Sequence, residues 1–263
     1  MLTAIQGIVF VVATVLLALG AMSLVRRTIK REALKSHHDV AGFVYAVLGV
    51  IYAVLLAFVV IVVWQQFDVA DQHSQEEAAA IANIYRLALS LPEAERLAIR
   101  QTLVAYVDVV VDEEWATMAR GEESPHASQL LNDVWRAFRR IEPRSEQEKA
   151  VYAEAMTQLT TLGKSRWQRL FDSREGLQPI MWTVLLVGGT LTVGFSLLFA
   201  VEDWHAHAMI TGSLTATIAI MLFLIYAFDY PFRGDVRVKS EPFEAVLSVM
   251  EIEAQAESRS AGR

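Results

Sequence analysis

The stretch AGFVYAVLGVIYAVLLAFVVIVVW, residues Ala41–Trp64, decides the fold because it contains no charged side chain. An α-helix rises 1.5 Å per residue, so about 20 apolar residues cross the roughly 30 Å of hydrocarbon in a bilayer. Each unsatisfied backbone group in lipid costs several kcal/mol, which makes a helix the form such a segment takes. We therefore expect Ala41–Trp64 to span a membrane.

Three further segments have the same length and character: Leu2–Val25, Leu177–Val201 and Ala206–Phe228. The 23 Lys and Arg residues and the 30 Asp and Glu residues all lie outside the four segments. A charge at the centre of a spanning helix costs about 2.5–3.5 kcal/mol, which explains this distribution. The sequence predicts an all-α, multi-pass membrane protein with four spans and excludes a single soluble globule. No charged residue precedes Arg26, so we expect the first segment to be a retained anchor.

The residues between the second and third spans have helical patterning throughout. Gln65–Leu89 is rich in strong helix formers, so the second span is expected to continue as one helix to Ser90. Capping-box patterns at Ser90–Glu93 and Ser145–Glu148 predict two further helix starts. The predicted organisation is a 2+2 arrangement, with spans 1 and 2 in residues 1–64, a helical bundle in 65–176, spans 3 and 4 in 177–228, and a tail in 229–263.

The orientation of the chain is predicted from its short loops. Residues 26–40 carry five basic and two acidic residues, whereas the loop at Glu202 and Asp203 carries only acidic ones. The positive-inside rule places the basic loop in the cytoplasm. With four spans, both termini and the bundle of residues 65–176 then lie outside.

Motifs for catalysis or metal binding are absent. The sequence has no Gly-rich phosphate loop, no Gly-x-Ser-x-Gly, no His-Glu-x-x-His and no cysteine. We interpret the acidic side chains of Asp108–Glu114 as a solvated helix face. The pairs His37–His38 and His205 with His207 are interpreted as interfacial loop residues, since two histidines make a weak metal site. We expect no catalytic residue, metal or cofactor, and no enzymatic activity.

One face of the second span carries small residues and then acidic ones. At spacings of three and four residues the face contains Gly42, Ala46, Gly49, Ala53, Ala57 and Val60, followed by Trp64, Asp68, Asp71 and Gln75. Small residues let helices approach closely in lipid, which is one interpretation. In the other, copies of this helix surround an axis and form a hydrophobic constriction followed by a ring of carboxylates. The candidate pore lining is then Gly49, Ala53, Ala57, Val60 and Trp64, and the candidate acidic ring at the pore mouth is Asp68 and Asp71.

Four stretches resemble the bestrophin-like family of bacterial four-span membrane proteins. They are Glu76–Pro92 (EEAAAIANIYRLALSLP), Tyr106–Trp115 (YVDVVVDEEW), Arg166–Trp182 (RWQRLFDSREGLQPIMW) and Asp229–Gly234 (DYPFRG). The resemblance implies a homo-oligomer, a pentamer, in the bacterial inner membrane, with the second span lining an ion pore. It also implies a cytoplasmic bundle, opposite to the orientation that the loop charges predict.

Two functions remain open. The first is a passive homo-oligomeric ion channel, in which the carboxylates favour cations and the resemblance favours anions. The second is a non-conducting membrane scaffold or sensor whose helical domain binds a partner. A proton-coupled transporter is disfavoured because the spans carry no buried carboxylate. The expected partners are the lipid bilayer, inorganic ions and further copies of the chain, and no nucleic acid.

Overall fold

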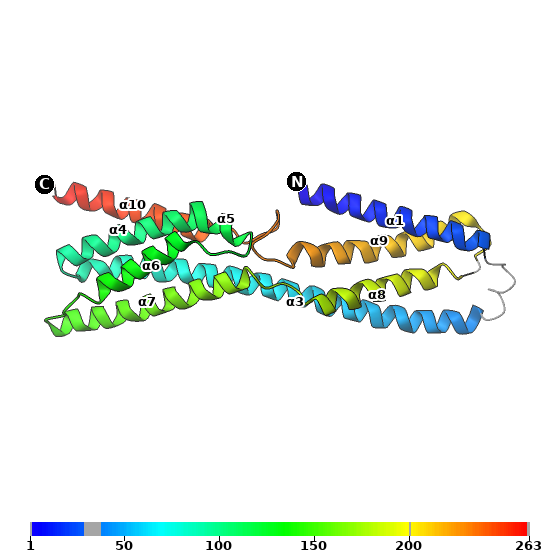
Figure 1. Ribbon diagram of the computed structural model, residues 1–263, viewed down its shortest axis with the longest axis horizontal. Coiled ribbons are helices and arrows are strands. Elements are labelled where there is room, and N and C mark those ends of the chain that lie inside the picture. Colours follow the sequence, from blue (N-terminus) through cyan, green and yellow to red (C-terminus); the bar gives the residue numbers. More distant parts are fainter. Residues whose placement is uncertain (1, 29–37, 200, 262–263) are drawn as a thin grey trace. The chain divides into compact units, whose positions relative to one another are not determined.

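The computed structural model describes residues 2–28, 38–199 and 201–261, and its described residues form helices and connecting turns without any strand (Figure 1). Four helices are long and apolar enough to cross a membrane. They are α1 (Leu2–Thr28), α3 (His38–Leu87), α8 (Pro179–Ser196) and α9 (Trp204–Phe228). The prediction of an all-α protein with four spans is confirmed.

The chain forms two compact units. The membrane unit contains residues 1–65, 176–229 and 234–236, and the second, extramembrane unit contains residues 66–175, 230–233 and 237–263. Helix α3 contributes its first part to the membrane unit and its last part to the extramembrane unit, because it continues without interruption from His38 to Leu87. The expectation that the second span runs on as one long helix is therefore confirmed, with the last turn, Ala88–Ser90, in 3₁₀ form.

The core of the membrane unit lies between α3, α8 and α9. It contains the buried residues Tyr52, Leu56, Val59, Val63, Leu185, Ile218, Leu222 and Ile225. The Tyr52 hydroxyl donates a hydrogen bond to the Leu185 carbonyl at 2.9 Å, which ties α3 to α8 inside the apolar core. Helix α1 packs along α9, where Phe10 and Phe223 bring their ring centroids to 6.3 Å.

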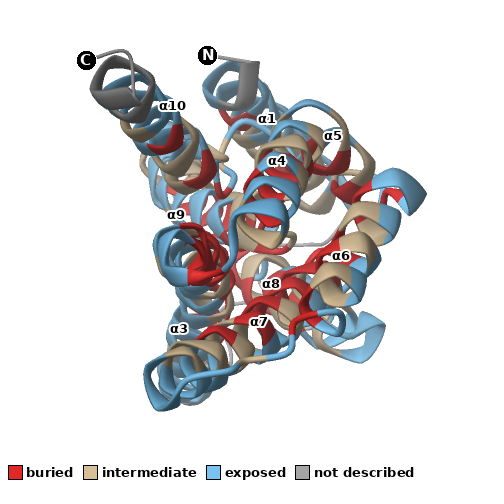
Figure 2. Cartoon of the chain, turned by 90° about the vertical axis from the view of Figure 1, so that its left-hand side faces the viewer, coloured by how far each residue is buried: buried red, intermediate tan, exposed pale blue. Residues whose placement is uncertain are grey.

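The extramembrane unit is a bundle built on the last part of α3. Its other helical elements are α4 (Glu93–Val109), the π-helical turn η2 (Val110–Glu114), α5 (Trp115–Met118), α6 (Pro125–Phe138), α7 (Glu146–Asp172) and α10 (Glu241–Ala261). Helices α4, α6 and α7 turn their buried residues toward the interior of this bundle (Figure 2). The core includes Ile81 from α3, Leu103 from α4, Phe138 from α6 and Leu159 from α7.

The segment after α9 belongs to the core of the extramembrane unit. Phe232, Val238, Phe243 and Met250 are buried there. The Trp115 indole donates to the Val238 carbonyl at 3.1 Å, and its ring meets the Phe243 ring at a centroid distance of 5.3 Å. The tail is thus part of the bundle's packing.

The capping patterns had different outcomes. Ser145 caps α7 as predicted, since its Oγ accepts from the Glu148 backbone N at 3.1 Å. Ser90 caps nothing, because α4 begins after Pro92 and has no side-chain cap. Helix α6 begins at Pro125, because Ser124 caps it by accepting from the Ala127 backbone N at 3.1 Å.

Candidate functional site

The small-residue face of α3 lies beside the face that packs in the core of its own chain. Ala53 and Ala57 are exposed, and a Cβ built on Gly49 would meet no atom within 4 Å. Val60 is half-buried and packs against the core that contains Tyr52. The chain itself therefore leaves Ala53 and Ala57 open to lipid, to water or to another copy, and covers Val60 in part.

The last candidate lining residue, Trp64, keeps 58% of its surface exposed and places its ring 5.4 Å from that of Phe228. Farther along α3, Asp68 is exposed and Asp71 is half-buried. One Asp71 carboxylate oxygen accepts a hydrogen bond from Gln75 Nε2 at 2.8 Å. Both acidic residues therefore lie on the helix with their carboxylates near solvent.

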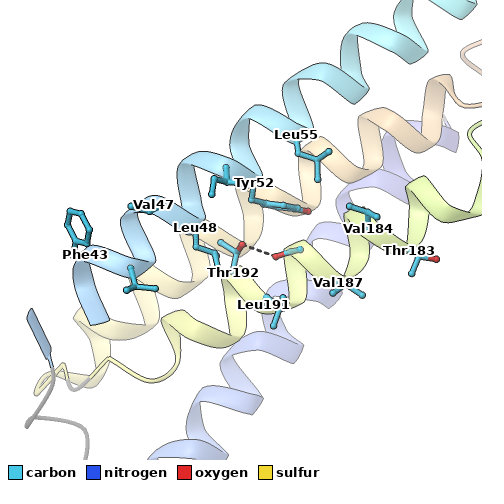
Figure 3. A pocket seen from close by; sticks show the side chains of 13 residues that line it. Phe43, Val47, Leu48, Tyr52, Leu55, Thr183, Val184, Val187, Leu191 and Thr192 are labelled. Carbon is cyan, nitrogen blue, oxygen red and sulfur yellow. Dashed lines mark hydrogen bonds between the residues drawn. The ribbon is translucent and has the colours of Figure 1, made fainter. Parts of the chain in front are cut away.

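An apolar groove lies between α3 and α8 on another flank of α3 (Figure 3). It has a volume of about 710 Å³, and Tyr52 and Leu55 face Val184 and Val187 across it. The hydroxyl of Thr192 is satisfied within α8, because it donates to the Gly188 carbonyl at 2.8 Å. The groove therefore offers almost no polar group to an ion, and its surface suits hydrocarbon.

The extramembrane unit contains a buried network of charges. Arg169 is fully buried, and its Nε donates to Glu77 Oε2 at 2.7 Å while its Nη2 donates to Glu114 Oε2 at 2.7 Å. Arg166 donates to the other Glu114 oxygen at 2.6 Å, and the Tyr106 hydroxyl donates to Glu77 at 2.6 Å. The two carboxylates and two guanidinium groups balance, so the network itself carries no net charge.

Burial and pairing act in opposite directions on the pKa values of this network. Burial alone would raise the pKa of Glu114, but Arg169 and Arg166 outweigh it and hold that pKa below its ordinary value. The pKa of Tyr106 is raised well above its ordinary value by burial and by Glu77. Glu114 is therefore ionised and the Tyr106 phenol is protonated near neutral pH.

Glu114 corrects the interpretation of the acidic run as a solvated face. Asp108 and Asp112 are exposed as expected, but Glu114 is completely buried. Glu114 follows the buried Val107 by seven residues and the buried Val110 by four, so helical spacing places it on the apolar face of this segment and away from Asp112. The sequence signal that could have located the network is the pair Arg166 and Arg169, which occur on the apolar face of an amphipathic helix.

Asp229 joins the ends of α8 and α9 within the membrane unit. One carboxylate oxygen accepts from the Leu177 backbone N at 2.5 Å and the other from Trp182 Nε1 at 3.1 Å. The carboxylate is buried with both oxygens occupied by donors. This explains why an Asp stands at the start of the Asp229–Gly234 turn.

The histidines contribute no metal site in the part of the chain that the structure covers. His207 is buried in α9, with Nε2 3.1 Å from the Ser196 carbonyl oxygen, so its interpretation as an interfacial loop residue is wrong. His205 is exposed at the start of the same helix. The side chains of His37 and His38 lie outside the described residues. Among the described residues, no three His, Cys, Asp or Glu side chains group as metal ligands.

Four apolar helices with a helical bundle inserted between the second and third define a polytopic α-helical membrane protein of the 2+2 type. The profile of the Bestrophin-like domain matches residues 12–243, and the chain belongs to that family. Among curated proteins none matches the chain.

Solved structures share this fold. A crystal structure of a point variant of a bacterial bestrophin homologue from Klebsiella pneumoniae aligns with a TM-score of 0.68 at 17% sequence identity, covering 94% of this chain and 96% of that one. A second crystal structure of a bestrophin homologue from Klebsiella pneumoniae gives a TM-score of 0.67 at 17% identity, covering 93% of this chain and 95% of that one. The similarity covers both the spans and the bundle.

Proposed function

We propose that the chain assembles with copies of itself into an ion channel in the bacterial inner membrane, with α3 lining the pore. The observation that carries the proposal is the position of Gly49, Ala53 and Ala57, where a Cβ on Gly49 would meet no atom and both alanines are exposed; Val60 on the same face is half-buried. Small residues allow copies of α3 to stand close around an axis, and an apolar neck of that kind gates ions by dewetting. Membership of the Bestrophin-like family and the bestrophin homologues of the same fold support it.

The pore mouth in this proposal is formed by Asp68 and Asp71. Repeated by symmetry, these carboxylates form a ring of negative charge, which raises the local concentration of cations. The buried network fixes the position of this part of α3, because Glu77 on the same helix accepts a hydrogen bond from Arg169 of α7. The ring therefore favours cations at this end of the pore.

Planar bilayers test conduction and native mass spectrometry tests assembly. The channel proposal predicts an oligomer, a pentamer by family resemblance, and discrete single-channel currents. Asp68→Asn with Asp71→Asn should shift the reversal potential in a salt gradient toward that of anions, and Val60→Ala should change the single-channel conductance. A monomeric mass together with bilayers that show no current would contradict the channel proposal. That result would favour the alternative, a non-conducting scaffold or sensor.

The orientation of the bundle is proposed from the loop charges, which place it outside. The chain has no cysteine, so a single introduced cysteine is the only thiol that a maleimide can label. Glu146 has a side chain that is 90% exposed at the start of α7. Labelling of Glu146→Cys in intact cells by a membrane-impermeant maleimide supports the outside placement, and labelling only after lysis places the bundle in the cytoplasm.

A further inference from the structure

Helix α7 presents an exposed aromatic pair near its C-terminal end. Trp167 is 65% exposed and Phe171 is 45% exposed, and their rings stack with centroids 5.5 Å apart at an interplanar angle of 17°. Arg166, Arg169 and Leu170 of the same helix are buried in the bundle, so the aromatic pair lies on the opposite side. Each ring carries a large apolar area that water solvates poorly, which suggests an apolar or interfacial neighbour.

Basic residues flank the aromatic pair on the same side of the chain. Lys164 precedes Trp167 by three residues, and Arg174 follows Phe171 by three. Both are exposed. Two acids are neighbours: Asp172 is engaged elsewhere, since its Oδ2 lies 2.6 Å from His73 Nδ1 on α3, and Glu175 is exposed beside Arg174. Aromatic rings flanked by Lys and Arg are the composition found where proteins meet the headgroups of a bilayer.

The covalent chain limits the distance between the C-terminal end of α7 and the start of α8. The turn after α7 is closed by the Glu175 backbone N, which donates to the Phe171 carbonyl at 3.2 Å. From Glu175 to Pro179, the first residue of the apolar helix α8, the chain has four residue steps and spans at most about 14 Å. The polar headgroup layer adds about 5–8 Å beyond each side of the hydrocarbon. The tether therefore allows the aromatic pair to reach the headgroups.

We propose that the face formed by Lys164, Trp167, Phe171 and Arg174 binds the anionic headgroup layer of the bilayer that α8 enters. The rings occupy the interface, and the two basic side chains contact lipid phosphates. The binding holds the C-terminal end of α7 at the membrane surface. It requires neither a pore nor a particular number of subunits.

Spin labelling tests the proposal in nanodiscs that contain phosphatidylglycerol. A nitroxide on Phe171→Cys should be more accessible to oxygen, which concentrates in lipid, than to a water-soluble nickel complex. The matched control Glu146→Cys lies on the same helix and should show the reverse. A label at residue 171 that the nickel complex reaches freely would overturn the proposal. A label that neither reagent reaches would overturn it as well, in favour of contact with a second copy.

The charge of the lipid provides a second test. In the Phe171→Cys background, Lys164→Gln should lower the preference of the label for phosphatidylglycerol over phosphatidylcholine nanodiscs about fivefold, the effect of one basic residue near an anionic surface. Lys149→Gln is the control, since Lys149 is exposed on the same helix and pairs with Glu146. Equal preferences in both variants would contradict phosphate binding by Lys164. Both readouts are spectroscopic, so they stand if the chain conducts no ions.

Discussion

Arg169 donates from Nε to Glu77 Oε2 at 2.7 Å, and neither side chain has any exposed surface. The bond joins α7 to the long helix α3, and Arg169 Nη2 extends the junction to Glu114 in the π-helical turn. A buried charge is tolerated only when its partners remain, because an unpaired ion in the interior costs several kcal/mol. The junction is therefore a point where a single substitution affects three elements.

Arg169→Met is expected to destabilise the bundle strongly. The change leaves the Glu77 carboxylate buried without a cation, which costs about 3–5 kcal/mol and corresponds to a fall in Tm of about 10 °C. The fall in Tm is measured by thermal unfolding in mild detergent, monitored by circular dichroism. Arg136→Gln serves as the control, since Arg136 is 58% exposed beside Asp133 and should change Tm little. Equal shifts in the two variants would refute the role of the network.

Acid should lower the free energy of unfolding of the bundle, because Glu114 becomes protonated. Its pKa is lower in the folded chain than its ordinary value of 4.5, because Arg169 and Arg166 outweigh the effect of burial. A lowered carboxyl pKa contributes stability that is fully present above the unfolded value and is lost as the pH falls through the folded one. The difference in Tm between the native chain and Glu114→Gln should thus be constant from pH 7 to about 5 and narrow below about 4. A difference independent of pH over that range would contradict this assignment.

Gly188→Ala should weaken the contact between α3 and α8. A Cβ at position 188 would lie 2.6 Å from the Tyr52 ring, so the ring or the helix must move. Overpacking of this kind costs about 1–3 kcal/mol. Gly194→Ala is the matched control on the same helix, because a Cβ there meets no atom within 4 Å. We expect Gly188→Ala to lower the Tm and Gly194→Ala to leave it unchanged. An equal loss of Tm in both variants would show that the Tyr52 contact is not the cause.

Asp229→Ala should destabilise the membrane unit more than Asp229→Asn. Alanine leaves the Leu177 backbone N and the Trp182 indole N without their acceptor, whereas asparagine keeps one oxygen for one of them. Loss of a hydrogen bond to a charged group costs about 1.5–3 kcal/mol. The two variants are compared by thermal unfolding, and identical Tm values would mean that these two bonds contribute nothing.

The four membrane-spanning helices could be predicted from the sequence because they depend on composition alone. Charge is absent from Ala41–Trp64 and its three counterparts, and no tertiary contact is needed to interpret that absence. The continuation of α3 to Leu87 also followed from local propensity, since no Gly or Pro interrupts Gln65–Leu87.

The partners in the buried network could not be predicted because only tertiary contacts bring them together. Helical spacing places Glu114 on the face of Val107 and Val110, opposite Asp112, but it does not indicate that Arg166 and Arg169 of α7 pair with it. The burial of His207 also depends on a tertiary contact. Its helix α9 begins three residues earlier, at Trp204, so that His207 lies inside the helix and packs against α8.

The central claim is that α3 lines a pore, and cysteine accessibility in conducting bilayers tests it most directly. Ala57→Cys and Phe58→Cys are adjacent and both exposed in the single chain, and they point to different sides of α3. We predict that a charged, water-soluble methanethiosulfonate reagent reduces the current through Ala57→Cys channels and leaves the current through Phe58→Cys channels unchanged. An Ala57→Cys current that the reagent does not alter would contradict the account.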